Sequence, residues 1–373
     1  MMPRSDSLNR TAANPLPSTA ALFQGVDKPW EFPTIPLRDP APGEILVKVL
    51  ACTICGSDLH TICGRRHALP PAVLGHEIVG QVLAIGPNTS SLDHLGNHIQ
   101  PSDRIVWGIV ANCGKCFYCL NDLPQKCSLA FKYGHQQISE GSIWQGGFAQ
   151  HCMLAPGTTI VRLPEHLSLN AACPLSCATS TIAAAMRIAA PLTNQRVLVV
   201  GAGMLGLTAL AFARELGAAR IACLEPDSSR RELALGSFRA DAAGDAEELS
   251  RSIANNQNGI GFDIIIECSG SNAGTLDAMR LMRTGGKCIL VGAVFPSAPI
   301  PLVLEEIVRR QWTIHGVHNY RSNDLVRAVE FMSDAQARYP FADLVREKFP
   351  LKQIEQAVIA AQMRENIRVA ILP

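Results

Sequence analysis

The stretch Val197-Leu-Val-Val-Gly201-Ala-Gly203-Met-Leu-Gly206 decides the fold of the second half of the chain. Its first four residues are an apolar run typical of a buried strand, and the residues after the glycines favour a helix. In such a unit Gly201 makes the tight turn, Gly203 lets the backbone approach a pyrophosphate, and Gly206 packs helix on strand. The helix N-terminus offers N–H groups to the phosphates. The stretch therefore predicts a dinucleotide-binding site.

Glu225 lies nineteen residues after Gly206, where the next expected strand ends. A carboxylate at this place would bind the diol of the adenosine ribose and would repel a 2′-phosphate, so it favours NAD over NADP. Arg230 and Arg231 lie nearby and keep NADP open as the alternative. The alternative to a dinucleotide-binding site is an ordinary strand-to-helix turn at residues 201–206 with Glu225 as a surface residue.

Strands and helices alternate on both sides of the glycine-rich turn. We expect strands at 195–200, 220–224, 263–268 and 287–292 and a helix at 204–216 that Gly217 ends. This alternation predicts a doubly wound parallel sheet. The first half is β-rich instead, with expected strands at 44–50, 76–84 and 103–107. After residue 311 the regularity ends, and we expect helices at 327–332 and 353–361 and a strand at 368–372.

These patterns predict an α/β protein with two domains, as the length of 373 residues also suggests. Residues 1–178 form a β-rich catalytic domain, and residues 179–311 form a doubly wound, Rossmann-type cofactor domain. Residues 312–373 return to the catalytic domain. The run 197–213 approaches the length of a membrane span, but glycines divide it, so we interpret it as the core of a soluble protein.

Composition argues against several functions. The formal net charge is +1, so the chain has no basic field to gather nucleic acid or anionic lipid. The first twenty-odd residues lack the apolar core of a secretory signal. Without an export signal, the 13 cysteines are better explained as metal ligands or buried thiols than as a disulfide framework. We expect a cytoplasmic protein with no membrane or nucleic-acid partner.

Four cysteines form the most specific motif of the chain. They follow the spacing C-x2-C-x2-C-x7-C, and they are Cys113, Cys116, Cys119 and Cys127. Four thiolates can enclose Zn²⁺ in a tetrahedron that leaves no position for water, so the motif predicts a structural zinc site. An iron–sulfur cluster is the alternative metal centre. A zinc module that reads nucleic acid is less favoured, because Lys115 and Lys126 are the only cations of this segment.

A second set of metal ligands lies upstream. Cys55 and His76 are suited to zinc, and both lie where an expected strand meets a loop. A catalytic zinc would need one further protein ligand and an open coordination position.

The motifs together carry a family resemblance. Cys55-Gly-Ser57-Asp58-Leu-His60, Gly75-His76-Glu77, the four-cysteine segment and the glycine-rich turn follow each other in this order. From about Pro36 onwards the chain resembles the zinc-containing medium-chain alcohol dehydrogenases. The resemblance implies a GroES-like catalytic domain, a Rossmann-type cofactor domain and two Zn²⁺ per subunit.

The resemblance also implies the third ligand of the catalytic zinc, about two dozen residues before the glycine-rich turn. Cys177 lies twenty-four residues before Gly201 and fits, and Cys173 is the rival. The polyol-dehydrogenase branch of the family has an acidic residue near this point, and this chain has none.

Further roles follow from the resemblance. Ser57 would hydrogen-bond the zinc-bound alcohol, and His60 would carry its proton toward solvent through the nicotinamide ribose. Asp58 would orient His76, and Glu77 would lie behind the metal. The alternative without a catalytic role is a plain turn residue for Ser57 and a solvated loop histidine for His60.

At the other end of the chain, Arg368 resembles the family's arginine that reaches the cofactor pyrophosphate; a surface arginine on a terminal strand is the alternative. Two segments could concern the substrate. Arg65 and Arg66 would lie near the substrate mouth and could hold a carboxylate, phosphate or phosphonate. The run Leu123-Pro-Gln-Lys-Cys127 followed by Lys132-Tyr-Gly-His135 also resembles a subgroup associated with phosphonate catabolism. A charge pair on a solvated loop is the common alternative.

The sequence therefore predicts a zinc-dependent dehydrogenase that oxidises a primary or secondary alcohol reversibly to an aldehyde or ketone with NAD. Its partner would be a small-molecule alcohol or carbonyl compound. The alternatives are a polyol or cyclic-alcohol dehydrogenase of the same family, a zinc-less quinone-reductase-type relative, and a non-catalytic NAD-binding relative. The resemblance also implies a dimer or tetramer, joined through edge strands of the cofactor domains.

Overall fold

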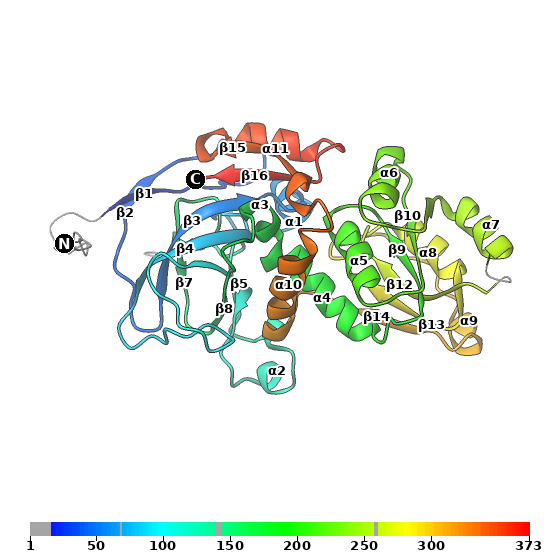
Figure 1. Cartoon of the computed structure of the whole chain (residues 1–373). Coiled ribbons are helices and arrows are strands. Elements are labelled where there is room, and N and C mark those ends of the chain that lie inside the picture. The colour runs from blue at the N-terminus through cyan, green and yellow to red at the C-terminus, as the bar shows by residue number, and fades with distance from the viewer. Residues whose placement is uncertain (1–15, 68, 139–142, 257–259) are drawn as a thin grey trace.

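The computed structural model describes residues 16–67, 69–138, 143–256 and 260–373. Most of the amino-terminal stretch that we searched for a secretory signal lies outside these ranges. Two domains lie side by side in Figure 1, a β-rich domain on the left and a domain built around a parallel sheet on the right. The α/β fold class expected from the sequence is confirmed.

The catalytic domain is built on an eight-stranded sheet. Its main order is β15-β16-β3-β4-β5-β6, with β7 paired to β3 and β8 paired to β5. The strands are β3 (Ile45–Thr53), β4 (Glu77–Ile85), β5 (Arg104–Ala111), β6 (Phe131–Lys132), β7 (His151–Leu154), β8 (Thr158–Arg162), β15 (Val345–Pro350) and β16 (Arg368–Leu372). A small antiparallel pair, β1 (Pro17–Thr19) and β2 (Thr34–Pro36), lies beside it.

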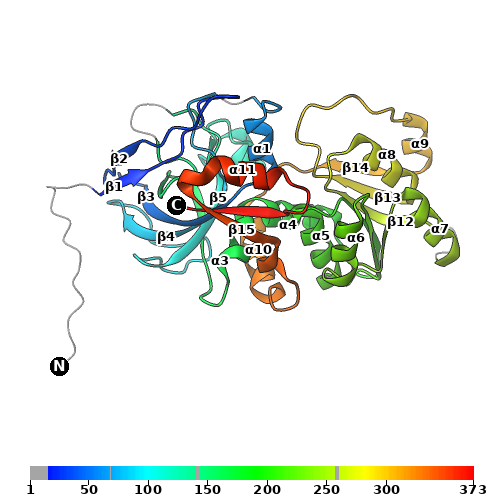
Figure 2. The same ribbon diagram turned by 90° about the horizontal axis from the view of Figure 1, so that it is seen from above.

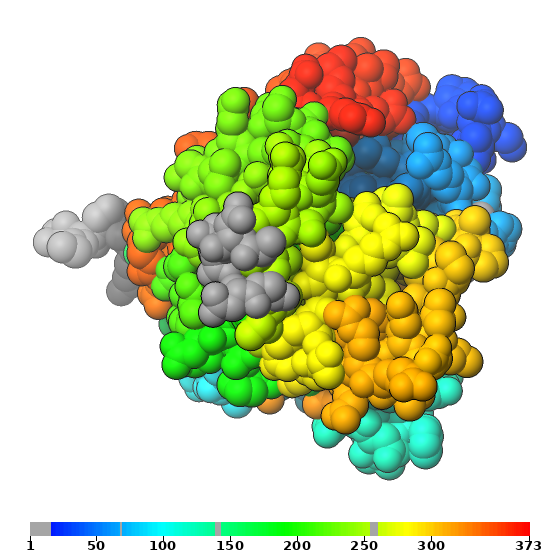
Figure 3. All heavy atoms as spheres, turned by 90° about the vertical axis from the view of Figure 1, so that its right-hand side faces the viewer, coloured from blue at the N-terminus to red at the C-terminus, as the bar shows by residue number. Residues whose placement is uncertain are grey.

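The segments between the strands of this domain contain short helices. They are α1 (Gly56–Ile62), α2 (Phe117–Leu120), the 3-10 helix η1 (Pro124–Lys126), α3 (Leu169–Ala172), η3 (Phe341–Leu344), η4 (Leu351–Gln353) and α11 (Ile354–Gln362). Helix α2 and η1 belong to a lobe that projects from the body of the molecule in Figures 1 and 3. The last strand, β16, pairs antiparallel with β3 through Ala370 and Thr53, so the end of the chain does return to this sheet.

The cofactor domain contains a six-stranded sheet in the order β11-β10-β9-β12-β13-β14, and all its pairs are parallel. Numbered within the domain, this order is 3-2-1-4-5-6, which is the doubly wound order of dinucleotide-binding folds. The strands are β9 (Arg196–Val200), β10 (Arg220–Leu224), β11 (Ala242–Gly244), β12 (Phe262–Glu267), β13 (Met282–Leu290) and β14 (Thr313–Gly316). The flanking helices are α5 (Met204–Glu215), α6 (Ser228–Gly236), α7 (Ala246–Asn256), α8 (Asn272–Arg280) and α9 (Leu304–Arg309).

The expected boundary at residue 311 falls too early for this sheet. Strand β14 lies at Thr313–Gly316 and pairs with β13, so the sheet extends into the segment that we assigned to the return. The strand is short and mostly exposed, and edge strands of this kind carry little apolar periodicity to reveal them. Strand β11 at the opposite edge was missed because its three residues, Ala-Ala-Gly, are too few and too small to show a strand periodicity.

Helices at the junction join the two domains. They are η2 (Cys173–Ser176), α4 (Ala178–Ala189) and α10 (Ser322–Ala335). One hydrophobic cluster runs from Val79 of the catalytic sheet through Ile182 of α4 to Val199 of the cofactor sheet. The two domains therefore share a core, and α4 spans the junction.

A search of the described residues for membrane-spanning helices finds no single helix that is long and apolar enough. One bent pair, Leu169–Ser176 with Ala178–Ala189, meets the length and composition criteria across a bend of 58°. The long apolar run 197–213 divides between β9 and α5 and is buried almost throughout.

Candidate active site and metal centres

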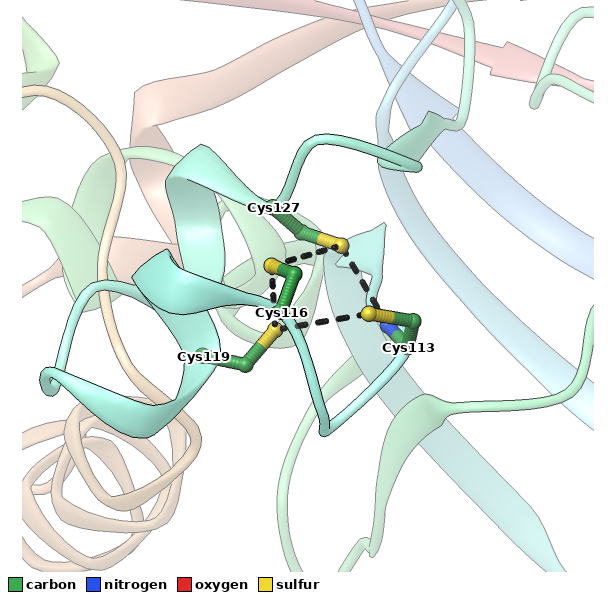
Figure 4. Close-up of side chains that lie close together, drawn as sticks. All are labelled: Cys113, Cys116, Cys119 and Cys127. Carbon is green, nitrogen blue, oxygen red and sulfur yellow. Dashed lines mark hydrogen bonds between the residues drawn. The ribbon is translucent and has the colours of Figure 1, made fainter.

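The four cysteines of the projecting lobe converge on one point (Figure 4). The Sγ–Sγ distances are 3.5 Å for Cys116 and Cys119, 3.8 Å for Cys116 and Cys127, and 4.0 Å for Cys113 and Cys119. All four cysteines are free thiols. A tetrahedron of sulfurs about 2.3 Å from a central Zn²⁺ has edges of about 3.8 Å. The spacing fits zinc, and no fifth His, Cys, Asp or Glu joins this group among the described residues.

Backbone N–H groups around this cluster stabilise the negatively charged thiolate form of its cysteines. The N–H groups of Cys113 and Leu129 donate to Cys127 Sγ at 3.3 and 3.4 Å. Backbone N–H groups of Cys119 and Ser128 lower the pKa of Cys116 to about 5. Thiolate is the form that binds metal, so the fold of this segment favours a metal centre over four neutral thiols.

A second, open cluster lies between the two domains. It consists of Cys55 before α1, His76 before β4 and Cys177 before α4, with their ligand atoms within 4.8 Å of one another. The Sγ atoms of Cys55 and Cys177 are 4.0 Å apart. The rival Cys173 is buried one turn earlier in η2, and burial raises its pKa. Among the described residues Cys177, and not Cys173, therefore joins Cys55 and His76 in a group that could hold a metal ion.

Asp58 fixes the geometry of this cluster. Its carboxylate accepts from the backbone N–H of Cys55 at 2.9 Å and from His76 Nδ1 at 3.1 Å. Asp58 is fully buried. Because the Nδ1–H of His76 is directed to the carboxylate, Nε2 is left as the ligand atom.

Ser57 and His60 lie on the cleft side of the cluster. Ser57 Oγ is 3.1 Å from His76 Nε2, so the hydroxyl lies where a ligand on the open side of the metal would meet it. His60 is partly exposed, and its ring packs on Phe295 with centroids 3.8 Å apart. Burial and then the nearby Arg65 lower the pKa of His60. Figure 2 shows the loop between β13 and α9, which carries Phe295, reaching across to α1.

Glu77 and Arg368 form a buried ion pair behind the cluster. Arg368 Nε and Nη2 donate to the two carboxylate oxygens of Glu77 at 2.9 and 3.0 Å, and Thr53 Oγ1 donates to the same carboxylate at 2.6 Å. The guanidinium also comes within 3.9 Å of Cys55 Sγ. Arg368 also lines the cleft together with Gly203, so its pairing with Glu77 leaves the pyrophosphate contact implied by the resemblance as a prediction. A fully buried carboxylate needs a counter-charge, and Arg368 supplies it.

The glycine-rich turn has the shape expected of a phosphate-binding loop. Gly201 has φ +91°, which favours glycine, and a Cβ on Gly206 would lie 1.8 Å from the Gly201 carbonyl oxygen. A Cβ on Gly203 would meet nothing within 4 Å, so this residue faces open space. Gly203 lines the cleft.

Glu225 follows β10 and lies directly beside this turn. Its carboxylate accepts from the backbone N–H of Ala202 at 2.6 Å. The two nearby arginines are engaged elsewhere: Arg230 donates to the Arg364 carbonyl and Arg231 to the Glu225 carbonyl and the Glu248 carboxylate. The carboxylate is thus held beside the glycine-rich turn, and its contact with an adenosine ribose stays a prediction.

One cleft of ≈ 470 Å³ connects these features. The metal ligands line it on the catalytic side, and Gly203, Met204 and Ser269 line it on the cofactor side. Sequence reasoning did not foresee that Phe295 and His318 line the same cleft as Lys132 and His135. Of the two arginines expected near the substrate, Arg66 lines the cleft and Arg65 is exposed outside its lining.

Comparison with known proteins identifies the domains. The family model described as "Alcohol dehydrogenase GroES-like domain" matches residues 41–165, and that described as "Zinc-binding dehydrogenase" matches residues 205–334. Among curated relatives, 5-exo-hydroxycamphor dehydrogenase of Pseudomonas putida is 27% identical over 88% of this chain and 91% of its own length. L-threonine 3-dehydrogenase of Pyrococcus horikoshii is 29% identical over 77% and 79%.

A solved structure extends the similarity to nearly the whole chain. An alcohol dehydrogenase from Thermotoga maritima matches with a TM-score of 0.89 and 27% identity, covering 96% of this chain and 100% of its own. A GroES-like domain and a doubly wound domain that share one cleft, lined by Cys55, His76 and Cys177, are typical of a zinc-binding dehydrogenase. The chain belongs to the zinc-dependent medium-chain alcohol dehydrogenase family, whose members are oxidoreductases that act on small-molecule alcohols with zinc and a nicotinamide cofactor.

Proposed function

We propose that this enzyme catalyses the reversible, NAD-linked oxidation of a primary or secondary alcohol to an aldehyde or ketone. The convergence of Cys55, His76 and Cys177 beside Ser57, on the wall of a cleft that also contains Gly203, carries the proposal. Cys113, Cys116, Cys119 and Cys127 would hold a second, structural zinc, which gives two per subunit.

Bound zinc would lower the pKa of a coordinated hydroxyl and polarise a carbonyl, and the nicotinamide ring would accept the hydride. The chain's own residues supply the rest. Asp58 keeps His76 Nε2 directed into the cleft. Ser57 Oγ, 3.1 Å from that nitrogen, hydrogen-bonds the substrate oxygen and accepts its proton, while the hydroxyl proton of Ser57 moves on toward His60. His60 releases it to solvent because its ring is partly exposed.

The preference for NAD rests on Glu225. Its buried carboxylate beside the glycine-rich turn would accept from the ribose diol and repel a 2′-phosphate. Arg230 and Arg231, the groups that could favour NADP, are engaged by Arg364, Glu225 and Glu248. We therefore keep NAD as the proposed cofactor.

A homo-oligomer is part of the proposal. Strand β14 is an edge strand of the cofactor sheet, and its residues are mostly exposed. An edge strand presents N–H and C=O groups that a second subunit could pair with. Both a dimer and a tetramer are compatible with this edge.

The decisive experiment is a substrate screen with zinc-loaded enzyme, in which NAD and NADP reduction are followed with simple alcohols, polyols and hydroxylated acids. We expect turnover with at least one class and a higher kcat/KM with NAD. Zinc content measured in parallel should approach two per chain. A zinc-loaded enzyme that reduces neither cofactor with any class would favour the non-catalytic alternative, and a preference for NADP would overturn the role of Glu225.

A further inference from the structure

A group of basic side chains lines one wall of the cleft, next to the open metal cluster. We call Arg66, Lys132, His135 and His318 the cationic wall; its charge lies on Arg66 and Lys132, because burial lowers the pKa of both histidines. Arg66 follows α1, Lys132 ends β6, His135 follows β6, and His318 lies between β14 and α10. Both domains contribute, and the described residues that line the cleft include no aspartate or glutamate.

Contacts place this wall at the substrate end of the cleft. The ring of His135 lies 4.8 Å from that of the metal ligand His76, centroid to centroid. Arg66 Nη1 is 3.4 Å from His135 Nε2. Glu225, which marks the adenosine end, lies beside Ala202 at the glycine-rich turn instead. A ligand that touches the cationic wall is thus next to the reacting carbon and away from the adenosine site.

The positive charge of the wall has no carboxylate partner among the described residues, although the nearby Cys177 raises the pKa of Lys132. No carboxylate of the described residues lies within salt-bridge distance of Lys132 or Arg66, whereas Arg368 in the same cleft is paired with Glu77. Lys132 is half-buried, and burial together with the like charges of Arg66 and Lys126 lowers its pKa to about 8. A cation kept partly out of water without a partner costs free energy, and a bound anion would offset that cost.

Lys126 of the projecting lobe orients His318. Its ammonium donates to His318 Nδ1 at 2.5 Å. Because Nδ1 accepts, the neutral ring carries its proton on Nε2 and can donate there. The lobe therefore contributes a neutral hydrogen-bond donor at the mouth of the cleft, where His318 is exposed.

We propose that the cationic wall binds a compact anionic group of the alcohol substrate, a carboxylate or a phosphate-type group, with Lys132 as the main anchor and Arg66 and His318 beside it. This inference rests on the proposed function, because it assigns the substrate class of the same cleft. Lysine supplies a point charge and arginine a planar pair of donors, a combination suited to carboxylate and phosphate oxygens. The physiological substrate is then a hydroxylated acid or hydroxylated phosphate-type compound.

Binding of simple anions tests the wall without requiring turnover. Acetate and inorganic phosphate are titrated calorimetrically into zinc-loaded enzyme saturated with NADH, which blocks the pyrophosphate site. We expect binding of at least one anion, weakened about tenfold or more in Lys132→Gln, since a charge-assisted hydrogen bond is lost. Lys132→Arg should stay within about threefold of wild type because it keeps the charge. Lys48→Gln, on the exposed side of β3, is the matched control and should bind as wild type does.

The two anions distinguish the substrate classes, since preference for acetate indicates a carboxylate and preference for phosphate a phosphate-type group. A second readout compares a hydroxy acid with its methyl ester: the ratio of their kcat/KM values should fall about tenfold in Lys132→Gln. The proposal is overturned if neither anion binds, or if Lys132→Gln binds both as wild type does. An enzyme that oxidises neutral alcohols but binds no anion would refute the wall alone, and anion binding without any turnover would refute the proposed function alone.

Discussion

The two cysteine clusters of this molecule differ in how the chain builds them. The closed cluster takes all its ligands from residues 113–127, within one projecting lobe. The open cluster joins Cys55 to Cys177 across 122 positions and places His76 between them. Local spacing is therefore sufficient to specify a metal site that supports structure. A site intended for chemistry depends on the tertiary fold, because its open side must face a cleft between domains.

The supporting groups differ in the same way. Backbone N–H groups surround the closed cluster, so its electrostatics come with the local conformation. Side chains from distant elements support the open cluster: Asp58 holds His76, and Arg368 pairs with Glu77. In the open cluster, substitution of a supporting side chain should therefore weaken zinc binding or turnover partially. In the closed cluster, mainly substitution of the cysteines themselves should weaken zinc binding.

The largest effect is expected from Cys55→Ala. Loss of one of three ligands should remove the catalytic zinc and lower kcat by about a thousandfold or more, because the Lewis acid is lost. Zinc analysis should show one ion fewer per chain, with the lobe zinc retained. Cys63→Ala, at an exposed cysteine outside both clusters, is the control. Unchanged turnover in Cys55→Ala would contradict the assignment.

An intermediate effect is expected from Asp58→Asn. The amide keeps the size of the side chain but loses the charge that orients His76, so zinc affinity or turnover should fall about 10- to 100-fold. Both are measured, by zinc competition with a chelator and by kcat with excess zinc. If zinc affinity and kcat both remain at the wild-type level, Asp58 only caps α1.

A smaller effect on turnover is expected from Cys116→Ala in the closed cluster. Loss of the lobe zinc should lower the midpoint of thermal unfolding by several degrees, because structural zinc contributes directly to folding. Turnover per folded molecule should change by no more than about threefold, since none of the four lobe cysteines lines the cleft and Lys126 contacts it through His318. Loss of turnover as severe as in Cys55→Ala would erase the distinction between the two clusters.

The smallest effect is expected from Cys173→Ala, which separates the two candidates for the third ligand. The side chain is buried but outside the open cluster, so its loss should leave zinc content unchanged. Packing alone is affected, and the free energy of unfolding should fall by about 1 kcal/mol. Cys177→Ala is the matched variant and should behave as Cys55→Ala does; the reverse pattern would assign the ligand to Cys173.

Short-range patterns in the sequence predicted what depends on neighbouring residues. The glycine-rich turn, the strand at Arg220–Leu224, the last strand at Arg368–Leu372 and the four-cysteine spacing could all be recognised because each motif carries its own geometry or periodicity. Edge strand β14 was missed because four mostly exposed residues carry no such periodicity.

Contacts between distant segments could not be predicted. The pairing of Arg368 with Glu77 joins residues 291 positions apart, and only the return of β16 to the catalytic sheet brings them together. The same holds for the cationic wall. Lys132 and Arg66 were visible as charges, but their shared wall with His318 depends on how the two domains meet.

The return of β16 also sets the order in which the protein can acquire its metals during synthesis. The lobe is complete once Cys127 has been added, so it can take up zinc while most of the cofactor domain is still untranslated. The catalytic centre must wait for Cys177, and Glu77 has no counter-charge until Arg368 has left the ribosome. If both clusters hold zinc as proposed, this order would let the closed cluster load early and would make the open cluster one of the last parts of the protein to be completed.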